Sequence, residues 1–284
     1  MPPKQSPTLT EAELRIMDVL WLKGAATVLV VLFVGGIALS ETAARKALDA
    51  HDASPGVEFK MARIKYKTYG GAGSHGIIQP WWAIDYPYAE EHFLAALSRV
   101  TTIDVFKDDP FEEQLELTDP RIFQFPFLFL QQPGQGRWRP TPQEAANLRE
   151  HLTRGGFLLI DDIHGEYDWR ILEAALKTVF PDRKIVDIPL TDPLMHIFYD
   201  LQPDVPIPGL RHLWRRGGQT VAQMEGTPVW RAIYDDQGRI MVAIDFNMDM
   251  GDAWEHADDP YYPVPFTANA YRVGTNYIIY AMTH

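Results

Sequence analysis

Acidic and histidine side chains come directly after an apolar run in the middle of the sequence. Residues 155–160 read Gly-Gly-Phe-Leu-Leu-Ile, and Asp161, Asp162 and His164 follow them. A carboxylate beside a histidine suits general acid–base catalysis or metal binding. The structural alternative is that Asp162 caps the next helix and His164 packs in the loop. We take Asp161, Asp162 and His164 as the candidate catalytic residues.

A second segment alternates oxygen-bearing side chains. Asn247 and Asp249 follow Asp245 at every second position, and Asp252 comes shortly after. Hard cations such as calcium favour loops of this kind. The EF-hand pattern is not met, because the glycine comes one place late and no glutamate closes the loop. The segment predicts a divalent-cation site at Asp249 and Asp252, with Asx turns as the alternative and no other cofactor expected.

Aromatic rings stand next to acids in two further segments, residues 81–87 and 254–263. Rings and acids together can line a pocket for a sugar or a cationic group, or they can simply pack against one another. The expected ligand-binding residues are Trp82, Asp85, Asn247, Trp254 and Glu255.

The elements that must position these residues alternate between strand and helix patterns. Apolar runs at 125–130 and 156–160 predict buried strands, and residues 229–234 and 239–245 predict a hairpin. Amphipathic spacing predicts helices at 88–100, from Thr141 to Gly155, at 169–180 and at 267–282, with a further strand at 184–190. This order predicts a three-layer α/β domain on a mainly parallel sheet. Ligands of such sheets bind outside the carboxyl ends of the strands, where the acids are expected.

The amino-acid composition excludes several classes of reaction and partner. The 284 residues include no cysteine, which excludes thiol nucleophiles, thiolate metal sites and disulfides. The formal net charge of -12 disfavours non-specific binding of nucleic acid, so none is expected as a partner.

Residues 24–39 contain no charged side chain, and Lys23 precedes them. We expect residues 24–40 to be a transmembrane anchor or a signal segment, with residues 1–23 cytoplasmic, 41–56 a linker and 57–284 the folded domain. The folded domain would then be periplasmic, or anchored to the membrane outside the cytoplasm. A buried core helix is the alternative for the apolar run.

Several segments together resemble the bacterial "domain of unknown function 4159" family. They are residues 82–87, 118–130, 155–162 and 247–263, and the closing residues 272–284. The resemblance implies a flavodoxin-like α/β fold, of the class I glutamine amidotransferase-like group that includes the trehalose-utilisation type; the apolar run at 24–39 adds an N-terminal hydrophobic helix to this expectation. It also implies export or membrane tethering, and neighbours such as MoxR-type ATPases and von Willebrand A-domain proteins. Amidotransferases need a cysteine nucleophile, so the absence of cysteine excludes a glutaminase.

Three hypotheses follow. The first is a module that binds a small polar ligand or an envelope protein partner at the carboxyl ends of the strands. The second is an Asp- and His-dependent hydrolase, with or without a metal, acting on carbohydrate. The third is a structural subunit of an envelope complex; the sequence leaves the oligomeric state open. The hydrolase hypothesis predicts that Asp162 or His164 lies within hydrogen-bonding reach of residues 247–255.

Overall fold

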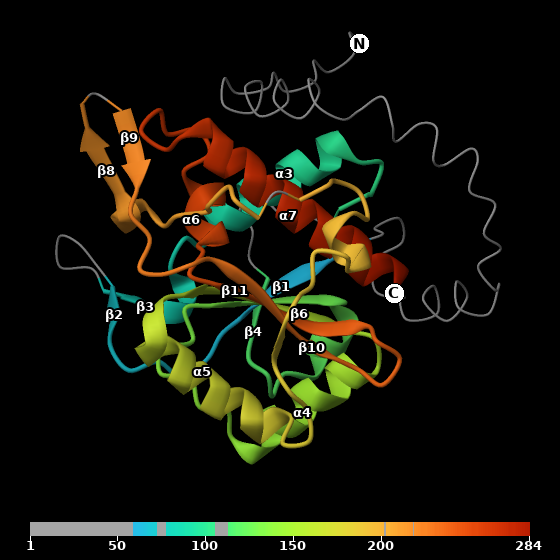
Figure 1. The fold of residues 1–284 in the computed structure, drawn as a ribbon. Coiled ribbons are helices and arrows are strands. Elements are labelled where there is room, and N and C mark those ends of the chain that lie inside the picture. Colours follow the sequence, from blue (N-terminus) through green and yellow to red (C-terminus); the bar gives the residue numbers. More distant parts are fainter. Residues whose placement is uncertain (1–58, 73–77, 106–112, 202, 218) are drawn as a thin grey trace, which may run out of the picture.

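A seven-stranded sheet in the order β4-β1-β5-β6-β11-β10-β7 forms the centre of the computed structural model, which describes residues 59–72, 78–105, 113–201, 203–217 and 219–284 (Figure 1). The first five strands in this order run parallel, and β10 is antiparallel to both of its neighbours. The strands are β1 Met61–Ile64, β4 Gln114–Leu115, β5 Phe127–Gln131, β6 Phe157–Ile163, β7 Val186–Asp187, β10 Val229–Tyr234 and β11 Ile240–Phe246. The mainly parallel α/β fold expected from the sequence is therefore confirmed.

Helices cover both faces of the sheet, so that β5 and β6 are buried along their whole length (Figure 1). One face packs against α4 (Pro142–Thr153) and α5 (Gly165–Val179), and the other against α3 (Tyr88–Val100), α6 (Met250–Glu255) and α7 (Val264–Thr283). The buried apolar residues divide into two cores, one on each side of the sheet. Such an arrangement requires strands that are apolar on both faces, as the sequence shows for β5 and β6.

Most sequence expectations for the elements agree with the structure. The helix over residues 88–100 is present as α3, and α4 begins with the expected capping box, in which Thr141 and Glu144 each bond the backbone amide of the other. Three expectations need correction. Helix α5 begins at Gly165, the strand expected at 184–190 is reduced to β7, and the segment expected as a cation-binding loop starts α6 at Met250.

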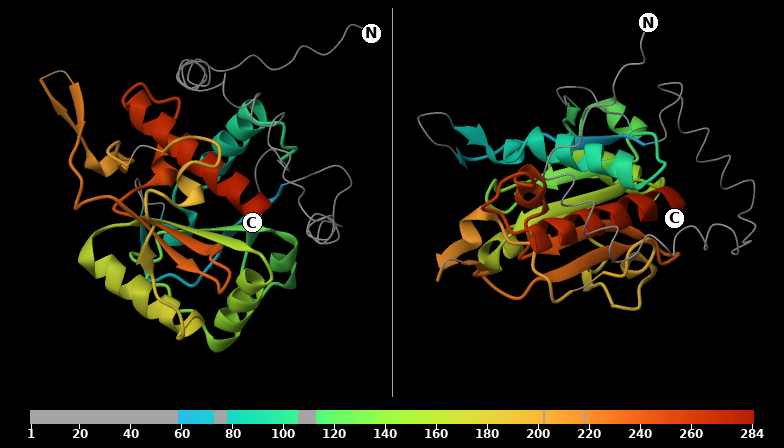
Figure 2. Two further views of the ribbon diagram at one scale, coloured as in Figure 1. Left: turned by 45° about the vertical axis from the view of Figure 1, so that its right-hand side comes forward. Right: turned by 90° about the horizontal axis from the view of Figure 1, so that it is seen from above.

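Smaller elements surround the sheet. Two hairpins, formed by β2 with β3 and by β8 with β9, project from the body (Figure 2). Their strands are β2 Gly71–Ala72, β3 Gln79–Pro80, β8 Leu213–Arg216 and β9 Gln219–Ala222. The part of the chain that the structure describes also contains four short 3-10 helices: η1 Trp81–Ala83, η2 Pro120–Gln124, η3 Pro193–Met195 and η4 Leu210–His212.

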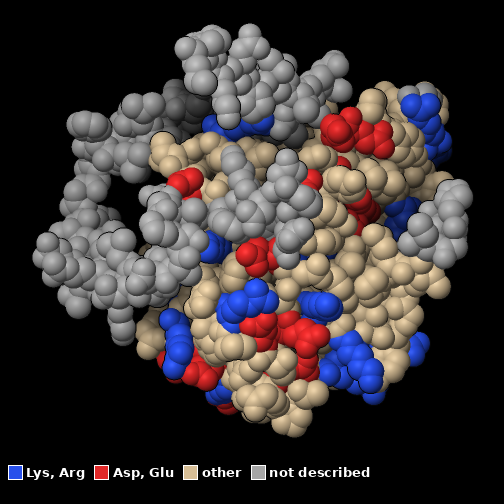
Figure 3. Space-filling view, turned by 180° about the vertical axis from the view of Figure 1, so that it is seen from behind, with Lys and Arg blue, Asp and Glu red and all other residues tan. Residues whose placement is uncertain are grey.

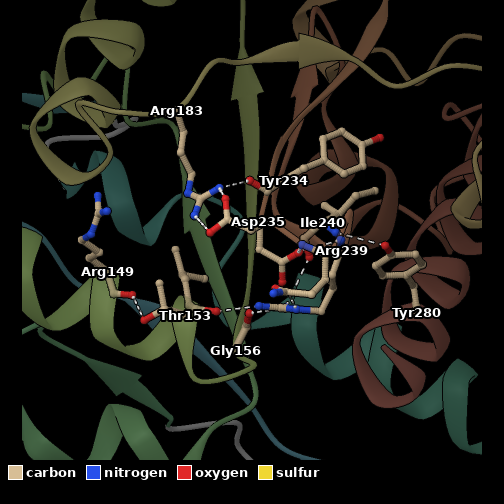
Figure 4. A network of polar contacts seen from close by, with 12 residues as sticks. Arg149, Thr153, Gly156, Arg183, Tyr234, Asp235, Arg239, Ile240 and Tyr280 are labelled. Carbon is tan, nitrogen blue, oxygen red and sulfur yellow. Dashed lines mark hydrogen bonds and ion pairs between the residues drawn. The ribbon is translucent and has the colours of Figure 1, made fainter.

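A polar network closes the amino-terminal end of the central strands (Figure 4). Arg239, at the start of β11, donates hydrogen bonds to the carbonyls of Gly156 at 3.0 Å and Leu152 at 2.6 Å, and to the carboxylate of Asp235 at 3.0 Å. The hydroxyl of Tyr280 accepts a 3.0 Å bond from the amide of Ile240. These bonds satisfy backbone groups where the strands begin, so this end of the sheet serves stability.

The expected anchor at 24–40 and its flanking segments 1–23 and 41–56 lie outside the described residues. Within the described ranges, no helix combines the length and the apolar character needed to cross a bilayer.

Candidate functional site

Three neighbouring strands, β5, β6 and β11, end in the same way. Gln132, Asp162 and Asn247 each adopt left-handed backbone at the strand end, with φ of 47°, 56° and 58°. The amide of Gln132 donates a 3.1 Å bond to the carbonyl of Asp161, and the amide of Asn247 donates a 2.7 Å bond to that of Ile163. The three strand ends therefore form one edge. We call it the polar rim, formed by Asp85, Gln131, Gln132, Asp161, Asp162, His164, Asn247 and Asp249.

Asp162 is almost fully buried at the centre of the rim. Its Oδ1 lies 3.0 Å from Nε2 of His164 and 3.3 Å from Nη2 of Arg211, and its side chain also bonds Gln132. Burial alone would raise the pKa of Asp162, but the hydrogen bond and charge of His164, followed by the charge of Arg211, hold this pKa below its ordinary value. Asp162 is therefore an ionised carboxylate beside a histidine.

Asp161 lies toward α6, where its Oδ2 accepts a 2.8 Å hydrogen bond from the amide of Gly251. Asp245 is its acidic neighbour on β11 and accepts a 2.5 Å bond from the hydroxyl of Tyr277 on α7. Burial, and then the charge of Asp245, raise the pKa of Asp161 well above its ordinary value, while burial raises the pKa of Asp245 to about 7. This pair of acids ties α6 and α7 to the sheet.

The two acids predicted to bind a metal take part in the start of α6. Asp249 caps this helix, because its Oδ1 accepts a 2.9 Å bond from the amide of Asp252. Oδ2 of Asp252 accepts a 2.6 Å bond from the amide of Leu210 in η4. One carboxylate oxygen from each of Asp85, Asp249 and Asp252 lies within 4.8 Å of the other two. The metal role of Asp249 and Asp252 stays a prediction.

The loop before α3 brings Asp85 to the rim. Nε2 of Gln131 donates a 2.6 Å bond to Oδ2 of Asp85. The carboxyl group of Asp85 also bonds that of Glu255, at the end of α6. Burial, followed by the charges of Asp252 and Glu255, raises the pKa of Asp85 well above its ordinary value. Both carboxyl groups therefore bind a proton more readily than ordinary acids do.

Trp82, a predicted ligand-binding residue, lies half-buried, with Nζ of Lys65 5.7 Å from its ring. Two others, Asn247 and Trp254, already have partners within the protein. Oδ1 of Asn247 accepts a 2.9 Å bond from the amide of Gly165, and its Nδ2 donates a 3.0 Å bond to the carbonyl of Thr227. Trp254 is fully buried and stacks on Phe93, with ring centroids 4.2 Å apart. We therefore leave Asn247 and Trp254 out of the ligand contacts proposed below.

Some residues at the site were missed by sequence reasoning. His212 lies in η4, with its ring centroid 4.5 Å from that of His164 and its Nε2 3.3 Å from Oε1 of Glu225. Burial, and then the charge of His164, lower the pKa of His212. Gln131 and Gln132 follow an apolar run just as the two aspartates do, and the same argument could have found them. His212 and Glu225 lie in an irregular, proline-rich part of the sequence, so nothing in the sequence predicted that they approach His164.

Several sets of side chains at the polar rim or directly beside it could hold a metal ion. The ligand atoms of each set lie within 4.8 Å of one another, and the sets are Asp162 with His164 and Asp249, His164 with His212 and Glu225, Asp85 with Asp249 and Asp252, and Asp252 with Glu255 and His256. Buried atoms near Asp162 that have no hydrogen-bond partner within the described ranges include Oε1 of Gln132, Nδ1 of His164 and Nδ1 of His212. The rim therefore combines carboxylates, imidazoles and unused polar atoms.

A separate hollow of about 390 Å³ opens beside the edge strand β4, lined by Lys65, Gln114, Glu116, Thr118, Asp119 and Arg121. None of the predicted site residues lines it. Its Arg121 is already paired with Asp119, at 2.7 Å. We therefore keep this hollow apart from the candidate site.

The family comparison covers nearly all of this body. Residues 60–282 match the model of the family described as "Domain of unknown function (DUF4159)". A search among curated proteins finds no match. The matched range runs from the start of the sheet into the last helix and includes the whole polar rim. The resemblance found from the sequence is thereby confirmed at the level of the family, and the chain belongs to the DUF4159 family.

Proposed function

We propose that the polar rim binds a small ligand rich in hydroxyl groups, of the carbohydrate class. One observation carries the proposal: the unpaired buried atoms of Gln132, His164 and His212 all lie around Asp162. A buried polar atom without a partner costs on the order of 1–3 kcal/mol, so several such atoms gathered around one carboxylate favour a site that a polar ligand completes. Hydroxyl groups both donate and accept, and they suit a site that offers acceptors beside ionised and neutral acids.

Backbone strain supports the same location. Four of the five non-glycine residues with positive φ in the described ranges belong to the rim: Asp85, Gln132, Asp162 and Asn247. Such conformations cost on the order of 1–3 kcal/mol each and cluster at functional sites. Asp and Asn tolerate this region better than most residues, which leaves Gln132 as the most telling of the four.

The test is a binding screen of the purified full chain against mono- and disaccharides and peptidoglycan fragments. A ligand at one hundred times its Kd should stabilise the fold by about 2.7 kcal/mol. Arg211 has 41% of its side chain exposed and contacts Asp162, so R211A should weaken binding at least tenfold. The control is R170A, since Arg170 is exposed on α5 and pairs with Glu166. A screen without any saturable binder, or equal effects of R211A and R170A, would contradict the proposal.

Hydrolysis of such a ligand is the second candidate, favoured by the 3.0 Å contact between Asp162 and His164. A carboxylate and a histidine at this distance can orient and deprotonate a water molecule. Glu255, with 28% of its side chain exposed beside Asp85, could then protonate a leaving group. If the chain hydrolyses a bound saccharide, D162N should remove turnover but retain binding within a few fold. If the ligand binds and is recovered intact, the hydrolase function is contradicted and only the binding function remains.

The proposal extends to the fold group and the cellular location of the chain. The strand order and the helices on both faces suit the flavodoxin-like, amidotransferase-like fold, without glutaminase chemistry because no cysteine is present. The uncharged run at 24–39 supports export or tethering, with an envelope protein as an alternative partner. Nucleic acid is not a proposed partner, since the net charge is -12 and the face in Figure 3 intersperses both signs. Fractionation of cells expressing the full chain, with protease accessibility of the domain, tests the location.

A further inference from the structure

We propose that His164, His212 and Glu225 bind a divalent transition-metal ion of the zinc class at the polar rim. The inference deepens the proposed function and rests on it, because the ion would lie inside the same site. It differs from the sequence expectation, which placed a hard cation on Asp249 and Asp252.

The geometry brings three ligands from three separate segments together. His164 precedes α5, His212 ends η4 and Glu225 follows β9, yet one ligand atom of each lies within 4.8 Å of the other two. Nitrogen and carboxylate ligands bind zinc at about 2.0–2.2 Å, so small side-chain adjustments bring these atoms into range. Two imidazoles with one carboxylate form a donor set that binds transition-metal ions in preference to calcium or magnesium.

The unpaired ring nitrogens are an independent observation. The side chains of His164 and His212 are 1% and 6% exposed, and Nδ1 of each has no hydrogen-bond partner within the described ranges. One unpaired ring nitrogen also occurs at the structural His151 of α4, so a single such atom does not indicate a site. At the rim, two buried rings with an unpaired nitrogen lie side by side, with centroids 4.5 Å apart, and this pairing is the observation that points to a shared ligand.

The surroundings complete a metal site. Asp162 stands 3.0 Å from Nε2 of His164, as expected of the outer carboxylate that orients a metal-bound histidine. Glu225 has 47% of its side chain exposed, so an ion and a ligand can reach the site from solvent. Three protein ligands leave a position open for water or for a ligand hydroxyl. A bound ion would supply Lewis-acid chemistry there.

The test uses the full chain, freed of metal with a chelator and titrated with Co²⁺. We expect one Co²⁺ per chain, a visible absorption band typical of four- or five-coordinate cobalt, and displacement by Zn²⁺. E225Q and H212Q should weaken binding at least tenfold, and D162N about tenfold. The matched controls are E173Q and H196Q, because Glu173 and His196 are exposed and outside the rim. Since Glu225 lies at the surface, E225Q decides the question even if H212Q fails to fold.

Absence of the cobalt band, or equal weakening in the control variants, would overturn the inference. So would binding of Mg²⁺ or Ca²⁺ that depends on Asp249 but not on His212. The saccharide screen, run on metal-free and metal-loaded chain, separates the two proposals. Saccharide binding without any metal leaves the proposed function intact, whereas metal binding without a saccharide contradicts only the proposed ligand.

Discussion

The amide of Gly251 donates a 2.8 Å hydrogen bond to Oδ2 of Asp161, which joins the first turn of α6 to the central strand of the sheet. The contact places two acidic segments, distant in the sequence, against each other. The carboxyl group of Asp161 is fully buried and holds a raised pKa, because of burial and then the charge of Asp245. Asp161 therefore positions α6, and the catalytic role that the sequence suggested for it stays a prediction.

Substitution of Asp161 should separate charge from hydrogen bonding. D161N keeps an acceptor for the amide of Gly251 and removes a buried acid, so stability at pH 7 should be retained. D161A leaves that amide unpaired and should cost on the order of 1–3 kcal/mol. Urea unfolding of both variants measures the difference. Equal destabilisation by D161N and D161A would show that the ionised carboxylate itself is required.

Asp245 predicts a pH-dependent stability. Burial raises its folded pKa to about 7, above the ordinary value of 3.8. The folded chain thus binds more protons than the unfolded chain between these values, and this group makes stability fall as pH rises from about 4 to 7. D245N should remove this contribution. The stability of D245N minus that of wild type should therefore be larger at pH 8 than at pH 5, by on the order of a few kcal/mol. Unfolding curves at the two pH values check the sign, and a variant with an unchanged pH slope contradicts it.

Gly156 leaves room for the ring of His151 at the start of β6. A Cβ at this position would lie 2.0 Å from Cε1 of His151, whose Nε2 donates a 2.8 Å bond to the carbonyl of Phe125. G156A should therefore displace the ring and cost about 1–3 kcal/mol. The double variant G156A/H151A should lose less than the two single losses combined, because the clash disappears. Thermal unfolding measures all three, and strict additivity would argue against this packing.

Arg63 and Glu90 form an ion pair in which both side chains are fully buried. Arg63 also donates to the carbonyls of Trp82 at 3.2 Å and Ile84 at 2.7 Å, which fixes the loop that carries Asp85. E90Q leaves a buried charge without its counter-charge and should cost about 3–5 kcal/mol. The double variant R63M/E90L should be closer to wild type in stability, but weaker in ligand binding, because the loop is released. Denaturant unfolding and saccharide titration separate the two effects.

Periodicity and turn chemistry predicted the elements that pack on the sheet, because burial imposes a repeat on them. Helix α3 and the capping box of α4 are examples. The length of β7 was overestimated, since an exposed edge strand imposes little hydrophobic pattern on its sequence. Helix α6 was missed because six residues that contain glycine and two acids lack a helical repeat.

For the site, the aspartates at the end of β6 were predicted from topology alone, because parallel strands expose their carboxyl ends along one edge. The pairing of His164 with His212 could not be predicted. It depends on how an irregular segment returns over the sheet, and a single sequence holds no signal for such a long-range contact. The roles of the individual residues likewise depend on partners that only the three-dimensional arrangement supplies.

Tyr280 has a further, practical meaning. Its hydroxyl is bonded to the first residue of β11, and its ring stacks on that of His284 at 4.3 Å. His284, which follows the last residue of α7, is thus held beside the amino ends of the strands, opposite the polar rim. An affinity tag or surface linker attached at His284 would therefore orient immobilised molecules with the rim facing outward, ready for capture of soluble ligands.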